Sequence, residues 1–283
     1  MLRIAVQSKG RLFEDTMALF TEADIKLSTS KRTLLTQSTN FPVEVLFLRD
    51  DDIPQCVANG VADLGIVGEN EFVERAEEAE IVHRLGFSKC RLSLAIHKEA
   101  EYDGLQWFNH KKIATSYPHI LKNFLNEQQI EADIHVITGS VEISPAIGLA
   151  DAIFDIVSSG STLISNNLKE VEVVMKSEAL LIGNKNLSAE KKEILQELLF
   201  RIDAVKTAED KKYVLMNVPT DKVNDIVEVL PGIKSPTIMP LATEGWSSIH
   251  TVIDQKRFWE IIGKLKAIGA QGILVLPIEK MIL

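Results

Sequence analysis

The 283-residue sequence lacks the features of a membrane or secreted protein. No apolar run reaches the length of about eighteen residues that a membrane-spanning helix needs. Residues 1–17 contain one short apolar run and no small-residue cleavage site of a secretory signal. The only two cysteines, Cys56 and Cys90, fit no metal-ligand spacing and are predicted to be reduced and buried. These absences predict a cytoplasmic protein with no membrane partner.

Arginine is scarce over most of the chain and concentrated at its start. Seven of the nine arginines lie in the first 95 residues beside four lysines, whereas the remainder has two arginines and eighteen lysines. Because arginine suits bidentate phosphate contacts, this bias indicates an anion site in the first third, although several of the seven could be plain surface arginines. The net charge of −9 argues against nonspecific nucleic-acid binding.

Short apolar runs alternate with amphipathic segments over the first two-thirds of the chain. This alternation is typical of a largely parallel α/β sheet that binds ligands at the carboxyl ends of its strands. The pattern predicts strands at 2–7, 43–49, 62–68, 111–116, 132–138 and 151–157, and helices at 10–23, 51–60, 118–129 and 144–150.

Two segments resemble each other and suggest two similar lobes with a cleft between them. "GVADLGIVGEN" (60–70) and "GLADAIFDIVSSG" (148–160) both run from Gly through Ala-Asp into a strand that ends in a loop. The chain is expected to cross between lobes at 92–104 and to return at 171–184. We therefore assign residues 1–95 with 178–208 to lobe I and residues 96–177 to lobe II.

The last 73 residues change character and read as strand, helix, strand, strand, helix, strand. This β-α-β-β-α-β order is the ferredoxin-like pattern and predicts a separate domain at 211–283. The charged stretch at 207–212 is the expected linker. Regulation or assembly is a more natural role for such a module than catalysis.

The stretch "DIVSSGSTL" (155–163) is the most informative in the sequence. Its hydroxyl and backbone N–H groups around Gly160 could wrap a phosphate, although a simple helix-capping turn has the same composition. Thr162 is the expected cap of the helix that follows. Glu142, Asp151 and Asp155 lie close by in sequence, and carboxylates beside a phosphate site are explained by sugar hydroxyls or a bridging Mg²⁺. The combination points to a phosphorylated sugar.

With these residues the sequence resembles a known family, the long form of ATP phosphoribosyltransferase, the first enzyme of histidine biosynthesis. The family motif matches from Glu142 and Gly148 through Asp155, Ser159, Gly160 and Thr162. The resemblance extends over essentially the whole chain. The other matching segments are "QSKGRL" (7–12), "RDDDIP" (49–54), 60–70, "CRLSLA" (90–95), "IATSYPHILKNFL" (113–125), "LPGIKSPTIMPLA" (230–242) and "GILVLPIEKM" (272–281).

The resemblance implies a reaction, a fold and a mode of control. The family joins N1 of the adenine ring of ATP to C1 of the ribose of phosphoribosyl pyrophosphate, with loss of pyrophosphate and a requirement for Mg²⁺. The fold consists of two lobes like those of periplasmic binding proteins. Long forms add a ferredoxin-like domain that binds L-histidine as feedback inhibitor, they form dimers and hexamers, and they need no separate regulatory subunit.

The resemblance also assigns residues to the phosphoribosyl pyrophosphate site. The loop holds the 5′-phosphate and the three carboxylates lie near the ribose hydroxyls, where they could stabilise positive charge at C1. Asp151 could instead be a turn residue. The metal ion is expected to be held largely by substrate oxygens, and no general base is evident. The assigned residues are Glu142, Asp151, Asp155, Ser158, Ser159, Gly160, Ser161 and Thr162.

A second set is assigned to ATP or pyrophosphate: Lys9, Arg11, Arg32, Arg49, Glu69, Arg91, Ser116 and Tyr117. Lys9 and Arg11 form a basic helix start, which is unusual because a helix N-terminus disfavours cations. Asp50–Asp52 beside Arg49 could serve as helix caps. Tyr117 could stack on adenine, contact the triphosphate or simply pack in the core. Glu69 is expected to face the cleft.

Four residues are assigned to the histidine effector: Asp221, Ser235, Pro236 and Thr237. Pro236 and Pro240 could instead protect an edge strand. Two rival functions remain for the whole chain. One is a two-lobed sensor that binds a small anion without turnover, and the other is a phosphoribosyltransferase that uses a different base.

Overall fold

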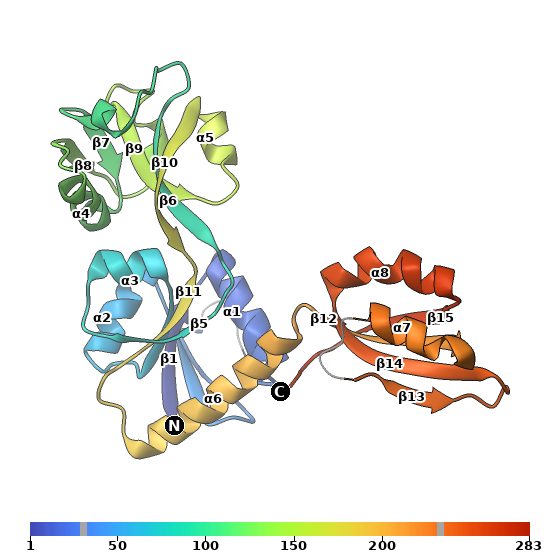
Figure 1. The fold of residues 1–283 in the computed structure, drawn as a ribbon. Coiled ribbons are helices and arrows are strands. Elements are labelled where there is room, and N and C mark those ends of the chain that lie inside the picture. The colour runs from blue at the N-terminus through green and yellow to red at the C-terminus, as the bar shows by residue number, and fades with distance from the viewer. Residues whose placement is uncertain (29–32, 231–234) are drawn as a thin grey trace. The chain divides into compact units, whose positions relative to one another are not determined.

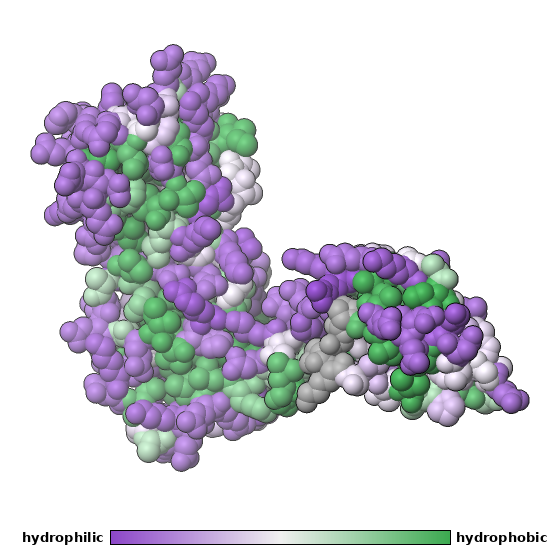
Figure 2. All heavy atoms as spheres, in the orientation of Figure 1, coloured by the Kyte–Doolittle hydropathy of each residue, from purple (hydrophilic) through white to green (hydrophobic). Residues whose placement is uncertain are grey.

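The structure, a computed structural model, describes residues 1–28, 33–230 and 235–283 and divides into two compact units (Figure 1). The first unit contains Met1–Phe20 and Ile25–Ile194, and the second contains Thr21–Asp24 and Leu195–Leu283. No helix in the described residues is long and apolar enough to cross a membrane. Figure 2 shows hydrophilic side chains over most of the visible surface. Cys56 and Cys90 are free but only half-buried, so the prediction that both are buried is wrong in degree.

The first unit contains two mixed sheets, and we call each sheet with its helices a lobe. The sheet of the first lobe has the order β2-β3-β1-β4-β11-β5. Its centre, β3-β1-β4, is parallel, and the outer pairs are antiparallel. The elements of this lobe are β1 (Leu2–Gln7), α1 (Arg11–Glu22), β2 (Leu35–Gln37), β3 (Val43–Leu48), α2 (Ile53–Ala58), β4 (Leu64–Gly68), α3 (Glu69–Arg75), β5 (Glu80–Arg84) and β11 (Ala179–Gly183).

The sheet of the second lobe has the order β10-β6-β9-β7-β8, with β9-β7-β8 parallel. The prediction of largely parallel sheets is wrong, because the strands that carry the chain into and out of this lobe, β6 and β10, pair in antiparallel fashion. The elements are β6 (Cys90–His97), β7 (Lys112–Thr115), α4 (Pro118–Glu127), β8 (Asp133–Val136), β9 (Ala152–Val157), α5 (Ser161–Ser165) and β10 (Leu168–Ser177), with 3₁₀ turns at Leu105–Phe108 and Val141–Ile143. A further 3₁₀ turn, Asp50–Asp52, belongs to the first lobe and precedes α2.

The helix predicted at 144–150 is absent, and this prediction was wrong. Only a 3₁₀ turn at Val141–Ile143 forms, followed by hydrogen-bonded turns. Gly148 has a φ of +73°, which ends the turns only four residues after Ser144, so the segment does not continue as a helix.

The internal resemblance between 60–70 and 148–160 is real and structural. Asp63 precedes β4, and its Oδ2 accepts a hydrogen bond from the backbone N of Arg3 at 2.8 Å. Asp151 precedes β9, and its Oδ2 accepts one from the backbone N of Lys112 at 2.9 Å. Each aspartate therefore ties the start of its strand to the neighbouring parallel strand. The two lobes use the same device at the same place.

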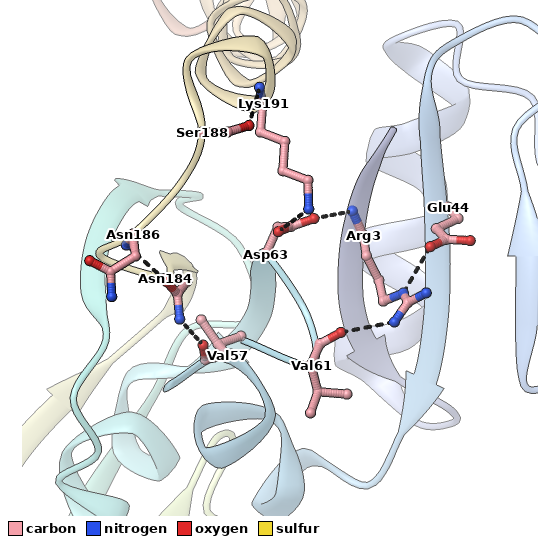
Figure 3. Close-up of polar contacts among 9 residues, drawn as sticks. All are labelled: Arg3, Glu44, Val57, Val61, Asp63, Asn184, Asn186, Ser188 and Lys191. Atoms are coloured by element: carbon pink, nitrogen blue, oxygen red, sulfur yellow. Dashed lines mark hydrogen bonds and ion pairs between the residues drawn. The ribbon is translucent and has the colours of Figure 1, made fainter. Parts of the chain in front are cut away.

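The helix α6 (Ala189–Ala208), which was not predicted from the sequence, also contacts Asp63 of this pair (Figure 3). Lys191 Nζ lies 2.7 Å from Asp63 Oδ1, and Asn184 Nδ2 donates to Val57 O at 2.7 Å. These contacts fix the start of α6 against the first lobe. The helix escaped prediction because its apolar side chains do not gather on one face.

The second unit contains the ferredoxin-like fold predicted for residues 211–283. Its antiparallel sheet has the order β13-β14-β12-β15, and Val214, Met216, Ile249 and Leu265 are buried between it and two helices. The elements are β12 (Lys211–Pro219), a 3₁₀ turn (Thr220–Lys222), α7 (Val223–Val229), β13 (Thr237–Pro240), β14 (Trp246–Asp254), α8 (Gln255–Ile268) and β15 (Gln271–Pro277).

Candidate functional site

The loop between β9 and α5 has the geometry of an anion cradle. Gly160 adopts a φ of +82° and occupies the N-cap position of α5, as its expected role requires. Ser159 Oγ lies 3.0 Å from Ser161 Oγ, so the two hydroxyls hold the turn closed. The first N–H groups of a helix have no partner within it and favour an anion. Thr162 lies inside the first turn of α5, so its predicted role as the cap is wrong.

Two carboxylates face this loop across a small hollow. The hollow has a volume of about 170 Å³. Glu142 reaches it from the 3₁₀ turn at Val141–Ile143, and Asp155 reaches it from near the end of β9. The structure thus brings Glu142 beside Asp155 and a loop that begins sixteen residues further along the chain. The lining residues are Glu142, Asp155, Ile156, Val157, Ser158, Ser159, Gly160, Thr162 and Leu163.

Asp155 titrates close to neutral pH. Burial, with a smaller contribution from the negative charge of Glu142, raises its pKa to about 6. The backbone N of Ile156 donates to Asp155 Oδ1 at 2.8 Å and opposes part of this increase. Asp155 is therefore a carboxylate above about pH 6, poised to accept hydrogen bonds or to face a positive charge.

Asp151 is not part of this hollow. It precedes the six-residue strand β9, at the opposite end from the loop, and its side chain is engaged by Lys112 N. The alternative that the sequence left open, a turn residue, describes the position of Asp151 in this structure. Ser161 also does not line the hollow, although its hydroxyl contacts Ser159.

A second, larger hollow of about 410 Å³ shares Ser158 with the first. It combines four cations, Arg84, Lys89, Arg91 and Lys176, with two carboxylates. Glu69 and Arg91 were predicted here, whereas Arg84, Lys89, Lys176 and Glu178 were missed. The missed residues lie at the end of β5, just before β6 and at the end of β10. Their proximity depends on how these strands are arranged in space, which the sequence does not show. The remaining lining residues are Cys90 and Ser177.

Arg84 in this hollow is paired with two carboxylates. Arg84 is held by Glu69, with contacts of 2.5 and 2.9 Å, and by Glu178 at 3.1 Å. Both carboxylates raise the pKa of Arg84 above its ordinary value. Glu69 consequently acts as a partner for a pocket arginine, and it reaches the cleft as expected.

Arg91 links the two hollows. Its guanidinium forms a bidentate pair with Glu170, at 2.5 and 2.6 Å, and its Nη1 donates to the carbonyl of Ser158 at 3.0 Å. The same arginine holds the pKa of Glu170 below its usual range. Arg91 therefore anchors the start of the 158–162 loop, and its contact with ATP or pyrophosphate stays a prediction.

The other predicted cations lie at different distances from these hollows. Arg11 pairs with Asp15 at 3.8 Å. Burial raises the pKa of the Cys90 thiol and the charge of Arg11 opposes part of this increase, so Arg11 lies near the larger hollow, which Cys90 lines. Lys9 lies in the exposed turn between β1 and α1. Arg49 is exposed, contacts Asp51 at 3.5 Å and lines neither hollow. Arg32 lies outside the described residues.

The structure also changes the roles expected of Asp50–Asp52 as helix caps and of Ser116 and Tyr117 as nucleotide contacts. Asp52 occupies the N-cap position of α2 without a side-chain cap hydrogen bond, and Asp51 instead faces Arg75 at 3.4 Å. Ser116 Oγ donates to Ile137 O at 2.7 Å. Tyr117 is only 7% exposed, so its ring packs in the core and is not free to stack on adenine in this structure.

In the second unit, the structure does not bring Asp221 to Ser235, Pro236 and Thr237. Thr237 pairs with His250, whereas Asp221 follows Pro219, which pairs with Trp246. These two positions on β14 are four residues, or about 14 Å, apart. Within one copy, a single small effector therefore does not meet both groups.

Comparisons with known proteins agree over the whole chain. Residues 49–204 match the family model for ATP phosphoribosyltransferase, HisG, and residues 208–280 match the model for the HisG C-terminal domain. The ATP phosphoribosyltransferases of Phocaeicola vulgatus and Bacteroides fragilis are 80% and 79% identical over 283 residues, covering all of both chains. That of Cytophaga hutchinsonii is 58% identical over 282 residues, covering 100% of this chain and 99% of the relative.

Two solved structures support the fold. A chain of the ATP phosphoribosyltransferase HisG:HisZ complex of Thermotoga maritima matches with a TM-score of 0.62 and 25% identity, covering 72% of this chain and 97% of that one. The substrate-binding protein of an amino acid ABC transporter matches with a TM-score of 0.50 and 11% identity, covering 74% and 94%. The two lobes therefore have the fold of periplasmic-type binding proteins, as predicted.

Proposed function

The chain belongs to the ATP phosphoribosyltransferase family, which carries out the first step of histidine biosynthesis, and we propose from this premise how its residues perform the transfer. The phosphoribosyl group of phosphoribosyl pyrophosphate moves to N1 of ATP, and pyrophosphate leaves. The supporting observation is the hollow of about 170 Å³ in which an anion-cradling loop faces two carboxylates. A sugar phosphate is the ligand that needs both features.

The loop and the carboxylates divide the work on the phosphoribosyl group. The N–H groups at the start of α5 and the hydroxyls of Ser159 and Thr162 bind the 5′-phosphate. Asp155 and Glu142 accept hydrogen bonds from the ribose hydroxyls and face the positive charge that develops at C1. Because glycosyl transfer passes through an oxocarbenium-like state, positioning and electrostatic stabilisation provide the catalysis, with little covalent work by the protein.

The larger hollow supplies positive charge for the phosphates. Lys89 and Lys176, together with Arg84 and the nearby Arg11, bind the leaving pyrophosphate and the triphosphate of ATP. Arg91 keeps the loop aligned with these cations through its contact with Ser158. Charge on the leaving group is stabilised in the hollow next to the one that holds the sugar.

The residues present fit a magnesium requirement. Glu142 and Asp155 provide oxygen ligands of the kind Mg²⁺ prefers, and the described residues contain no group of three or more acidic, histidine or cysteine side chains arranged for a metal. The ion would therefore take most of its ligands from substrate oxygens and some from these two carboxylates. When bound, it neutralises charge on the pyrophosphate.

We assign feedback inhibition by L-histidine to the C-terminal domain, with Asp221, Ser235, Pro236 and Thr237 as candidate contacts. The separation of Asp221 from Thr237 within one copy leaves these as two candidate contact points. Because the chain carries its own C-terminal domain, it needs no separate regulatory subunit, and it works as a cytoplasmic homo-oligomer, either a dimer or a hexamer.

The test is product identification with substrate omission. The purified chain is incubated with phosphoribosyl pyrophosphate, ATP and Mg²⁺, and the product is analysed by mass spectrometry and by NMR of the adenine ring. The proposal requires a phosphoribosyl-ATP product attached at N1 and formed only when both substrates are present. Equal turnover with a different base, or tight binding of the sugar phosphate without turnover, would favour one of the two rival functions.

A further inference from the structure

Asn70 is buried where the first lobe, the crossing strand β10 and the second lobe meet. It is the second residue of α3 and only 5% exposed. Its backbone N donates to Ser177 Oγ at 3.1 Å, and its Oδ1 accepts from the same hydroxyl at 2.8 Å. Its Nδ2 donates to Tyr117 Oη at 3.2 Å. Ser177 ends β10 and Tyr117 precedes α4, so one amide joins three elements.

The backbone leaves room for this side chain. A Cβ added to Gly68 would lie 2.5 Å from Asn70 Oδ1, closer than real Cβ contacts come. Only glycine at this position lets the amide fold back onto the strand end. The position of the Asn70 side chain thus depends on the glycine two residues before it. The proposed reaction gives the Asn70 amide no other role.

The hydroxyl of Tyr117 has its own second partner. Burial and the carboxylate of Glu71, the next residue of α3, raise the pKa of Tyr117, so this carboxylate lies beside the phenol. Because the amide Nδ2 of Asn70 can only donate, the phenol oxygen accepts from it and its own proton remains for Glu71. One turn further along α3, Glu74 accepts from the backbone N of His119 at 2.9 Å and of Ile120 at 3.0 Å. One face of α3 therefore holds the start of α4.

We propose that Asn70 is a positioning residue for the phosphoribosyl transfer: it sets the place of Tyr117, and through Tyr117 the approach of the second lobe to the first. This inference rests on the proposed function. The charge of Asp155 acts on the Tyr117 hydroxyl, so the held tyrosine lies within electrostatic reach of the site carboxylate. Displacement of Tyr117 disturbs catalysis without removing any group that touches substrate.

The surroundings of Asn70 make an aspartate there pH-dependent. A carboxylate at this place would face the same phenol as Glu71, with one phenolic proton for two acids. A protonated aspartate could still donate to Tyr117, whereas the ionised form could not. The charged and titratable groups around the cluster are Glu71 and Arg75 on α3, Asp50 and Asp51 on the adjoining 3₁₀ turn, Tyr117, Asp155 on β9 and Cys90 on β6.

The experiment compares Asn70→Asp with Asn184→Asp in the full chain. Asn184 is a matched control because its amide also bridges two elements, donating to Val57 O and Ala58 O, but within the first lobe. The expected result is a kcat for Asn70→Asp about 10- to 100-fold below wild type at pH 8, with the ratio to wild type recovering as the pH falls. The KM for phosphoribosyl pyrophosphate stays within about threefold of wild type, because the loop at 158–162 is untouched. The Asn184→Asp ratio stays flat with pH.

Two further variants keep the test decisive. Asn70→Ala adds no charge and is expected to lose kcat about tenfold if the aspartate variant does not fold. In a Tyr117→Phe background, Asn70→Asp is expected to change kcat by less than about threefold, because the hydroxyl that links residue 70 to the second lobe is no longer present. A kcat for Asn70→Ala within about twofold of wild type, or identical pH ratios for Asn70→Asp and Asn184→Asp, would overturn the inference. Failure of wild type to turn over would refute the proposed function instead.

Discussion

Glu142 and Asp155 face the same hollow beside the phosphate loop, and the negative charge of Glu142 adds to the burial that raises the pKa of Asp155 to about 6. Two like charges are held together only where a ligand or a proton relieves them. Below about pH 6 a proton on Asp155 does this, and during the proposed reaction the ribose and the developing cation do.

The first prediction concerns this carboxylate. Asp155 must be ionised to stabilise positive charge at C1, so kcat/KM for phosphoribosyl pyrophosphate should rise with pH through about 6 and level off above it. Asp155→Asn should lower kcat about 100-fold and remove this inflection. The measurement is a pH–rate profile for both proteins, and an unchanged inflection in the variant would assign it to another group.

The same pKa shift has a consequence for stability with the opposite sign. Because the folded-state pKa of Asp155 is raised, its protonated form stabilises the fold at low pH, and that stability is lost as the pH rises through about 6. Asp155→Asn should therefore gain thermal stability relative to wild type above pH 6 while it loses activity. Thermal unfolding without substrates at pH 5 and pH 8 checks this.

The second prediction concerns the backbone of the loop. Gly160 has a φ of +82°, and an added Cβ would meet nothing within 4 Å, so Gly160→Ala acts through backbone strain alone. We expect the KM for phosphoribosyl pyrophosphate to rise about tenfold as the loop relaxes. Gly245→Ala is the matched control, with a φ of +79° and equally open space in the second unit. It should cost similar stability but leave this KM unchanged, and equal effects on KM would refute a specific role for the loop.

The third prediction concerns the anchor of the loop. Glu170→Gln weakens the bidentate pair that orients Arg91 toward the carbonyl of Ser158, so the KM for phosphoribosyl pyrophosphate should rise about three- to tenfold. Arg91 lowers the pKa of Glu170, so the pair persists above that lowered pKa and is lost only as the pH falls through it. The variant should differ from wild type at neutral pH and converge with it in acid. Glu172→Gln, on the same strand and bonded to Tyr102, is the control and should leave KM unchanged.

The sequence was most informative where local pattern and motif coincide. The strands within "GVADLGIVGEN" and "DAIFDIV" were predicted and are present as β4 and β9. Gly160, which the sequence placed at the centre of the loop, has a φ of +82° in the structure. The C-terminal β-α-β-β-α-β order predicted the antiparallel sheet of the second unit.

What the sequence could not provide depends on long-range pairing. Arg84, Lys89 and Lys176 meet only because β5, β6 and β10 end in the same region, a fact set by strand order. Asp151 was assigned to the phosphoribosyl pyrophosphate site, yet it precedes β9 at the end opposite the loop, because each residue of a β-strand advances the chain by about 3.3 Å. The sequence left open whether Tyr117 stacks on a ligand or packs in the core, and its 7% exposure in the structure shows that it packs in the core.

Phosphoribosyl transfer by this chain is tested most directly by pyrophosphate release from phosphoribosyl pyrophosphate and ATP with Mg²⁺, with and without L-histidine. We expect release that requires both substrates, is suppressed by histidine, and falls sharply in Asp155→Asn and Thr162→Ala. Binding of the sugar phosphate by the folded protein without any release of pyrophosphate would contradict it, and the loop would then bind an anion without serving catalysis.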